Sequence, residues 1–271
     1  MKKIYYSLAC CLIGGMLASC GGGAKKSNAT EEAAAPTTTA VSYSKSLKAP
    51  ETDSLNLPID ADGYITIFDG KSLDGWRGYG KDKVPSRWII EDGCLKFCGT
   101  GTGEGQTGEG GDLIFAHKFK NFELSVDWKT SKMGNSGIFY YVREVPGKPI
   151  YYAAPEVQVL DNVDATDNKL ANHLAGSLYD MLPADPKTVK PAGEWNTIVI
   201  KVKDGKVTHT QNGKKVVQYT LWSKEWDDMV ANSKFKDFQG FQEGISHEGY
   251  IGLQDHGYPI WFRNIKIREL K

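Results

Sequence analysis

W-K-T-S-K-M-G-N-S-G-I-F-Y-Y-V-R at residues 128–143, E-V-Q-V-L-D-N at 156–162 and A-G-S-L-Y-D at 175–180 are the segments that decide the fold. Each of them is typical of a β-strand that keeps polar groups on one side. Because side chains alternate along a strand, we expect Glu156 and Gln158 on one face and the valines beside them on the other.

The segment at 138–143 alternates in the same way, so Phe139, Tyr141 and Arg143 are predicted to share a face. A carboxylate, an amide, a guanidinium and aromatic rings on neighbouring strands would form a sugar-type site. The alternative is a solvated outer face, which antiparallel sheets commonly have. Spacing alone leaves both interpretations open.

Further strand signals flank these segments with the same period of two. Residues 122–128 and 196–203 each place an apolar residue at every second position, and Glu91-Asp92-Gly93 and Asn212-Gly213 predict tight hairpin turns. Many short strands at regular spacing predict an all-β domain, a β-sandwich or jelly roll. Helix is scarce, and the best candidate is residues 221–232 with Ser223 as its cap. Residues 162–176 and 180–194 lack periodicity and are predicted to be long loops, which are often functional.

Composition excludes one class of partner. The chain has 271 residues with 40% hydrophobic and 24% charged residues, and its formal net charge is zero. That composition suits one large globular domain. Because no basic field exists to attract phosphates, we do not expect nucleic acid as a partner.

The N-terminus is typical of a targeting segment. Lys2 and Lys3 precede a short apolar run and then L-A-S-C, which ends at Cys20 and resembles a bacterial lipobox. We therefore predict a lipoprotein signal peptide at 1–19, with a lipidated Cys20 that anchors the protein to a membrane surface. The small polar residues that follow predict a flexible tether over 20–60 and a folded domain over 61–271. Which side of which membrane the domain occupies is not fixed by the sequence.

Two cysteines remain within the domain. Cys94 and Cys98 lie four residues apart on a predicted strand, about 13 Å at ~3.3 Å per residue. A disulfide requires Cα atoms within about 7 Å, so we predict two free thiols.

The last strands contain a second polar row. In Y-I-G-L-Q-D-H, Gln254 and His256 share a face, by the same alternation that pairs Glu156 with Gln158. Histidine is the natural group for proton transfer near neutral pH, although His256 is also compatible with a turn residue bonded to backbone, since Gly257 and Pro259 follow it. Neither a G-x-S-x-G nucleophile motif nor an H-E-x-x-H zinc motif is present in the sequence.

Several motifs together resemble the 3-keto-disaccharide hydrolase family over residues 62–270. These are F-D-G-K-S-L-D-G-W, G-N-S-G-I-F, E-V-Q-V-L-D, G-S-L-Y-D, P-A-G-E-W-N, G-L-Q-D-H-G and F-R-N-I-K-I. The resemblance implies a concanavalin-like jelly roll, activity on sugars oxidised at C3, and a secreted protein or lipoprotein of the kind found in Bacteroidetes. The positions that match the motifs are Asn135, Arg143, Glu156, Gln158, Asp161, Tyr179, Gln254 and His256. A lengthened stretch at 222–249 departs from the family and is expected to alter the pocket rim.

The implied reaction begins at a ketone on C3, which acidifies the proton on C2. A base removes that proton, the group at C1 leaves by β-elimination, and water adds to the enone. The resemblance assigns Glu156 and His256 as the base and acid, and the other matching positions as substrate-binding residues. Arg143 or a divalent metal would hold the enolate oxygen, and no further cofactor is expected. A two-carboxylate glycosidase needs carboxyl groups about 5–10 Å apart, and Asp161 is expected on the opposite strand face from Glu156.

Two other functions remain possible from the sequence. The same fold serves non-catalytic glycan-binding modules, because fold alone does not determine function. A structural surface protein whose functional feature is Cys20 is the third alternative. An enclosed base and acid favours the enzyme, and a shallow aromatic platform favours the binding module.

Overall fold

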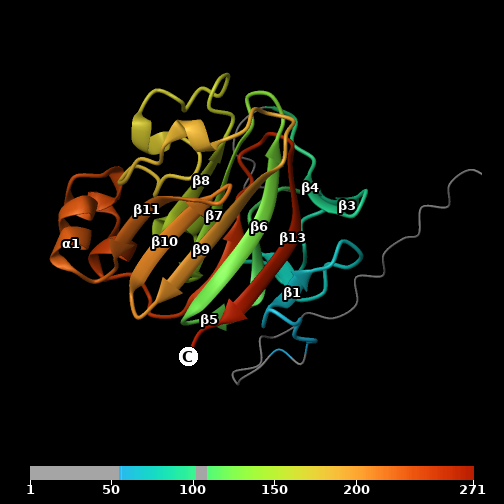
Figure 1. Cartoon of the computed structure of the whole chain (residues 1–271), viewed down its shortest axis with the longest axis horizontal. Coiled ribbons are helices and arrows are strands. Elements are labelled where there is room, and N and C mark those ends of the chain that lie inside the picture. Colours follow the sequence, from blue (N-terminus) through green and yellow to red (C-terminus); the bar gives the residue numbers. More distant parts are fainter. Residues whose placement is uncertain (1–54, 56, 102–108) are drawn as a thin grey trace, which may run out of the picture. The chain divides into compact units, whose positions relative to one another are not determined.

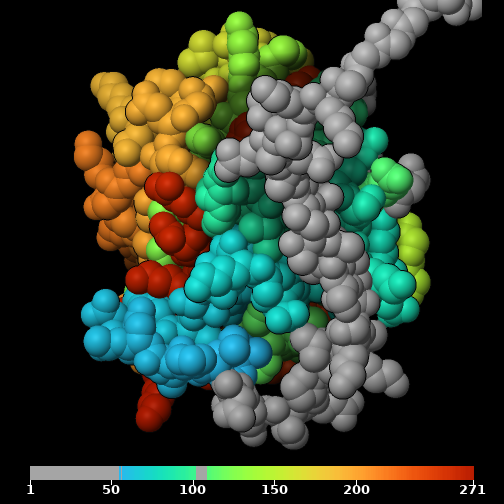
Figure 2. All heavy atoms as spheres, turned by 90° about the vertical axis from the view of Figure 1, so that its right-hand side faces the viewer, coloured from blue at the N-terminus to red at the C-terminus, as the bar shows by residue number. Residues whose placement is uncertain are grey.

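The computed structural model describes residue 55, residues 57–101 and residues 109–271, whose strands form two antiparallel sheets (Figure 1). The larger sheet has the order β11-β10-β9-β6-β13-β4-β3, with β1 pairing on β13. Its strands are β1 (Ile65–Phe68), β3 (Trp88–Glu91), β4 (Cys94–Phe97), β6 (Phe122–Thr130), β9 (Asn196–Lys203), β10 (Lys206–Gln211), β11 (Lys214–Thr220) and β13 (Ile260–Glu269). The pairing of β1 with β13 brings the start of the domain, blue in Figure 2, beside the red C-terminal strand.

The smaller sheet has the order β2-β5-β12-β7-β8 and carries the polar rows found in the sequence. Its strands are β2 (Trp76–Gly78), β5 (Leu113–Phe119), β7 (Asn135–Val142), β8 (Glu156–Leu160) and β12 (Gly249–Leu253). The two sheets and the scarcity of helix confirm the predicted concanavalin-like jelly-roll sandwich.

The core lies between the two sheets. In β6 every second residue from Phe122 to Trp128 is buried, as the alternation predicts, and Ile198 to Val202 repeats the pattern on β9. Val157, Val159, Ile251 and Leu253 contribute to the same cluster from the smaller sheet. The apolar faces of both sheets therefore meet, and the opposite face of the smaller sheet is left for the polar rows.

Tight turns join several neighbouring strands of the larger sheet. Asp92 and Gly93 have φ of 51° and 72°, and Asn212 and Gly213 have φ of 48° and 80°. Two consecutive left-handed residues form the turn that matches the twist of a hairpin. Both predicted hairpins are thus confirmed, between β3 and β4 and between β10 and β11.

The predicted helix is present as α1 (Lys224–Ala231). The Ser223 hydroxyl accepts a hydrogen bond from the Trp226 amide at 3.2 Å, and Trp226 and Val230 are its buried residues. The structure adds what the sequence analysis did not predict, a short α2 and four 3₁₀ turns. They are α2 (Gln239–Gln242), η1 (Ile150–Tyr152), η2 (Ala171–His173), η3 (Pro186–Thr188) and η4 (Lys234–Asp237).

A bulge in β7 changes the predicted faces of that strand. Tyr141 has a φ of 55°, and Tyr140 and Tyr141 of β7 lie opposite the single residue Ile251 of β12, between the pairs Phe139–Gly252 and Val142–Tyr250. Both Tyr140 and Tyr141 therefore enter the core, whereas Phe139 and Val142 pack together on the other face. The expectation that Phe139, Tyr141 and Arg143 share a face is wrong, because the extra residue shifts the alternation.

The outer face of the smaller sheet is covered and not solvated. Every residue of β7 and β8 is buried, and η1 contributes Ile150 to an apolar cluster with Phe139 on that face. The interpretation of these strands as a solvated sheet face is therefore wrong, and their polar side chains lie beneath loops.

Cys94 and Cys98 are free thiols, as predicted. Across the helices of the described segments, none combines the length and apolar character needed to cross a membrane. The predicted signal peptide, Cys20 and most of the tether over 20–60 lie outside the described residues.

Candidate active site

Three adjacent strands form the floor of the site. Gln158 on β8 pairs with Gly137 on β7, and the Gln254 amide just beyond β12 donates to the Gly137 carbonyl at 3.0 Å. Glu156 lies two residues before Gln158 on the same face and pairs with Phe139. The backbone register thus brings the two polar rows of the sequence to either side of β7.

Gly137 is required at the centre of this floor because the Glu156 side chain lies across it. A Cβ atom on Gly137 would stand 2.2 Å from Glu156 Oε1 and 2.8 Å from its Cδ. Any side chain at this position would displace the carboxylate. The G-N-S-G motif thus supplies space for Glu156.

The segment that carries Gln254 and His256 is fixed by its neighbours. The Ser136 hydroxyl donates to the Gln254 carbonyl at 2.8 Å. Asp255 points to the other side, where its carboxylate accepts from the amides of Gly111 and Gly257. These bonds orient the two flanking side chains toward the polar face.

A pocket of about 350 Å³, part of it open to solvent, lies on this face. Its lining residues all carry a hydrogen-bonding group, and they are Asn135, Tyr151, Glu156, Gln158, Asp167, Tyr179, Lys234, Gln254 and His256. A lining without aliphatic side chains suits a ligand covered in hydroxyl groups.

Six of the eight residues selected from the sequence are brought together here. They are Asn135, Glu156, Gln158, Tyr179, Gln254 and His256.

The other two residues selected from the sequence, Arg143 and Asp161, do not line the pocket. Arg143 follows the β7 bulge and instead contacts Glu243 at 3.2 Å and the Gly240 carbonyl at 3.3 Å. Asp161 accepts hydrogen bonds from the backbone amides of Met133 and Val163, so its carboxylate stabilises the surrounding turns.

Three lining residues were not predicted from the sequence: Tyr151, Asp167 and Lys234. All three belong to covering segments rather than strands, so no alternation marks them. Two weaker signals were present: Asp167 lies in the aperiodic stretch 162–176, and Lys234 lies in the lengthened stretch 222–249. That stretch does contribute to the pocket, as the departure from the family suggested.

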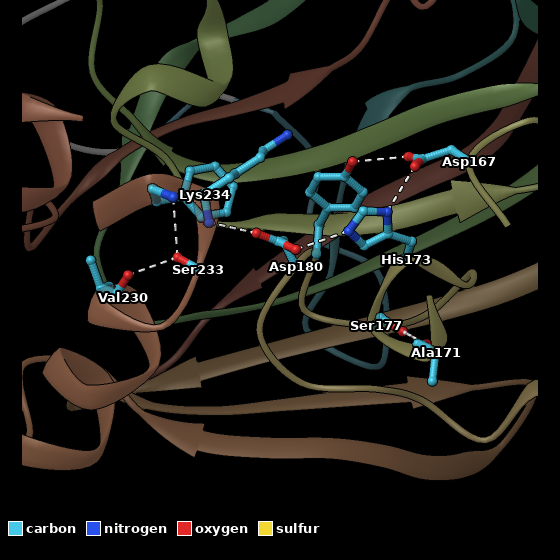
Figure 3. A network of polar contacts seen from close by, with 10 residues as sticks. Asp167, Ala171, His173, Ser177, Asp180, Val230, Ser233 and Lys234 are labelled. Atoms are coloured by element: carbon cyan, nitrogen blue, oxygen red, sulfur yellow. Dashed lines mark hydrogen bonds and ion pairs between the residues drawn. The ribbon is translucent and has the colours of Figure 1, made fainter. Parts of the chain in front are cut away.

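A chain of polar contacts joins the covering segments (Figure 3). The Tyr179 hydroxyl donates to Asp167 Oδ2 at 2.9 Å, and Asp167 Oδ1 lies 2.7 Å from His173 Nδ1. His173 Nε2 lies 2.9 Å from Asp180 Oδ1, and Asp180 Oδ2 accepts from the Lys234 amide at 2.6 Å. The loop 162–180 is thereby tied to η4.

Burial raises the pKa of the Tyr179 phenol well above its usual value, and the carboxylates of Asp167 and Glu156 add to the effect. Tyr179 therefore keeps its proton throughout the physiological range and acts as a hydrogen-bond donor to Asp167.

Three side-chain amides in the pocket have buried oxygen atoms with no hydrogen-bond partner among the described residues. These atoms are Asn135 Oδ1, Gln158 Oε1 and Gln254 Oε1, on side chains that are at most 5% exposed. Leaving such a group unpaired costs about 1–3 kcal/mol, so buried polar groups are normally satisfied. Their grouping in one pocket indicates that a polar ligand completes them.

A metal role, left open by the sequence, finds no support in the arrangement of side chains. Within the described segments, no group of three or more His, Cys, Asp or Glu side chains is placed to hold an ion. We therefore derive no step through a metal.

Comparisons with known proteins identify the family of the chain. The model of a family described as the 3-keto-alpha-glucoside-1,2-lyase-like domain matches residues 63–268. A protein of Bacteroides thetaiotaomicron called 3-keto-disaccharide hydrolase is 57% identical over 290 aligned positions that cover all of both chains.

Two solved structures are similar over most of the chain. A crystal structure described as a putative glycosyl hydrolase from Parabacteroides distasonis is 30% identical, with a TM-score of 0.70, and the match covers 78% of this chain and 95% of the other. A second structure with that description and source is also 30% identical, with a TM-score of 0.60 over 76% and 99% of the two chains.

Proposed function

The chain belongs to the family of 3-keto-alpha-glucoside-1,2-lyase-like domains, and from this premise we propose that it cleaves the glycosidic bond of 3-keto-glycosides. Membership of the family makes it an enzyme of the hydrolase or lyase class. The observation that carries the proposal is the row of unpaired amide oxygens beside Glu156, in a pocket lined wholly by hydrogen-bonding side chains.

The proposed reaction begins with Glu156 or His256 taking the proton from C2 of the bound sugar. The C2–H electron pair forms the C2–C3 double bond, and the C3 carbonyl becomes an enolate. When the enolate collapses, the C1–O bond breaks and the leaving oxygen takes a proton from the other member of the pair. Water then adds across the enone, with its oxygen at C1 and its hydrogen at C2.

The three amides serve as the substrate-binding groups. Their free oxygen atoms accept hydrogen bonds from sugar hydroxyls and so fix the ring over Glu156. Correct placement matters because a base must lie within hydrogen-bond reach of the proton it removes. Asp167 also carries a carboxylate into the pocket, but that group already accepts from Tyr179 and contacts His173.

The first test is an assay on a 3-keto-glycoside and on the same glycoside unoxidised. We expect the purified protein to release the aglycone only from the keto form, because only the ketone makes the C2 proton acidic. Glu156→Gln and His256→Ala should each lower kcat by ~10²-fold or more, the usual size of a general acid–base contribution. The exposed Glu248 gives a matched control, and Glu248→Gln should retain full activity. Binding of glycans without turnover of any keto substrate would instead favour the glycan-binding module.

We further propose that the protein is a lipoprotein anchored to the cell envelope through Cys20. The support is the L-A-S-C sequence after a short apolar run with two preceding lysines. A palmitate analogue should label the wild-type protein, and Cys20→Ala should abolish both the label and membrane association. Unchanged membrane association of that variant would overturn the anchor.

A further inference from the structure

The proposed reaction needs a positive group beside the C3 oxygen, because negative charge develops there as the C2 proton leaves. Arg143 does not line the pocket and is engaged with Glu243. Of the described side chains that do line it, Lys234 is the one lysine or arginine.

Resting on that proposed function, we propose that Lys234 is the catalytic cation that holds the enolate oxygen of the 3-keto sugar. Nothing in the strand pattern indicates it, since Lys234 begins η4 in the lengthened stretch 222–249. Its role follows from where two covering segments place its ammonium group.

Aromatic rings hold the ammonium at the pocket. Lys234 Nζ lies 4.2 Å from the ring centroid of Tyr179, 5.3 Å from that of Tyr151 and 5.2 Å from that of Phe235. A ring face attracts a cation through its quadrupole. Such contacts orient the ammonium without using an oxygen acceptor, and its N–H donors therefore stay available for a ligand.

The backbone of Lys234 is fixed by the same network that positions Tyr179 (Figure 3). Its amide donates to Asp180 Oδ2, and the contacts of Asp180, His173 and Asp167 lead back to the Tyr179 hydroxyl. Ser233 caps the turn by accepting from the Phe235 amide at 3.1 Å. The main chain of Lys234 and the ring beneath its ammonium are thus parts of one connected unit, which limits the positions that the charge can take.

Lys234 gains and loses no proton in this step. When the C2 proton passes to the base, the C3 carbonyl electrons move to its oxygen, and a Lys234 N–H donates a hydrogen bond to that oxygen. When the C1–O bond breaks, the same electrons return and the carbonyl is restored. The interaction is strongest at the enolate, so it lowers the barrier more than it strengthens substrate binding.

The chain offers a close control in Lys236, an exposed lysine on the same 3₁₀ turn that does not line the pocket. We expect Lys234→Met to lower kcat by ~10²–10³-fold, the cost of removing one oxyanion donor, with a much smaller change in KM. Lys236→Met should leave both constants unchanged, and Lys234→Arg should recover part of kcat because it retains the charge. Lys236→Met replaces an exposed lysine, so its thermal unfolding should stay within about 2 °C of wild type, since surface changes are usually within about 0.5 kcal/mol. Lys234→Met also loses the attraction between its charge and the rings, about 0.5–1 kcal/mol at an exposed site, and should lower the unfolding temperature by no more than about 4 °C.

A second measurement isolates enolate formation. A 3-keto sugar with no leaving group at C1 can exchange its C2 proton but cannot be cleaved. In D₂O, wild-type protein should catalyse this exchange, visible as loss of the C2 proton resonance, and Lys234→Met should slow it by the same factor as kcat. Exchange at the wild-type rate in that variant, or equal effects of the two methionine variants, would overturn the role of Lys234. If wild-type protein neither cleaves nor exchanges, the proposed function itself fails.

Discussion

Gly137→Ala tests whether the position of the Glu156 carboxylate sets the activity. The new Cβ atom would stand 2.2 Å from Glu156 Oε1, and real Cβ atoms essentially never come within 3.0 Å of such an atom, so the carboxylate must move by about 0.8 Å. Rotation of the carboxylate alone does not relieve the contact, because Cδ and Cγ lie only 2.8 Å and 2.9 Å away. Gly137 is not among the residues with positive φ, so alanine fits the backbone.

Two effects of this change can be sized. A misplacement of about 1 Å costs ~10²-fold in rate when the reacting groups are otherwise aligned, so we expect kcat/KM to fall by that order. Overpacking a buried site costs ~1–3 kcal/mol, which for a domain of this size lowers the unfolding temperature by ~2–4 °C per kcal/mol.

The assay is a double-mutant cycle with Glu156→Ala, read by thermal unfolding so that it does not depend on residual activity. With the carboxylate removed, Gly137→Ala should cease to destabilise and should gain ~0.4–1 kcal/mol from reduced freedom of the unfolded chain. Gly78→Ala, in β2 of the same sheet, controls for overpacking in general: its Cβ atom would meet Lys81 and the Lys83 carbonyl at 3.0–3.1 Å and not Glu156, so its effect on stability should be the same in both backgrounds. Equal destabilisation by Gly137→Ala in both backgrounds would refute the reasoning, as would wild-type kinetics of the single variant.

Two further predictions concern the core and the thiols. Burial lowers the pKa of His209 from 6.5 to about 4. Between these two pH values the unfolded chain binds more protons than the folded chain, so the free energy of unfolding falls as the pH drops. The loss should reach about 3 kcal/mol, at ~1.4 kcal/mol per pKa unit. Urea denaturation from pH 7 to pH 4 should show this loss, and His209→Phe should flatten it; parallel profiles for the two proteins would contradict the cause. Burial also raises the pKa of the Cys94 thiol, whereas Cys98 is only half-buried. Iodoacetamide should therefore modify Cys98 in the folded protein and Cys94 only after unfolding, and equal labelling of both in native protein would count against it.

The sandwich was predictable from the sequence because alternation is a local property. The buried positions from Phe122 to Trp128 and the hairpin turn at Asn212-Gly213 each depend on a few consecutive residues. Glu156, Gln158 and Gln254 could be selected for the same reason, since each belongs to a strand or its direct continuation.

What the sequence does not reveal arises from contacts between distant segments. The bulge at Tyr141 carries no glycine to mark it, yet it removes Arg143 from the polar face. The path from Asp167 through His173 and Asp180 to Lys234 joins the aperiodic stretches to the lengthened stretch 222–249. Asp180 and Lys234, which meet in this path, are 54 positions apart in the sequence. Neither the periodicity of apolar residues nor secondary-structure propensity can predict such contacts, because only tertiary packing brings these residues together.

The covering of β7 and β8 explains how the pocket can discriminate between sugars. Loops cover the floor, and the oxygens of Asn135, Gln158 and Gln254 have no hydrogen-bond partner among the described residues. A ligand with hydroxyls at the matching positions satisfies them, whereas one that lacks a hydroxyl leaves a buried acceptor unpaired, at about 1–3 kcal/mol each. Sites built to hydrogen-bond their substrate reject analogues that lack the bonding group far more strongly than apolar pockets reject a change in size. The three amides would therefore favour a correctly hydroxylated ring, and in the proposed reaction the C2 proton of that same ring lies over Glu156.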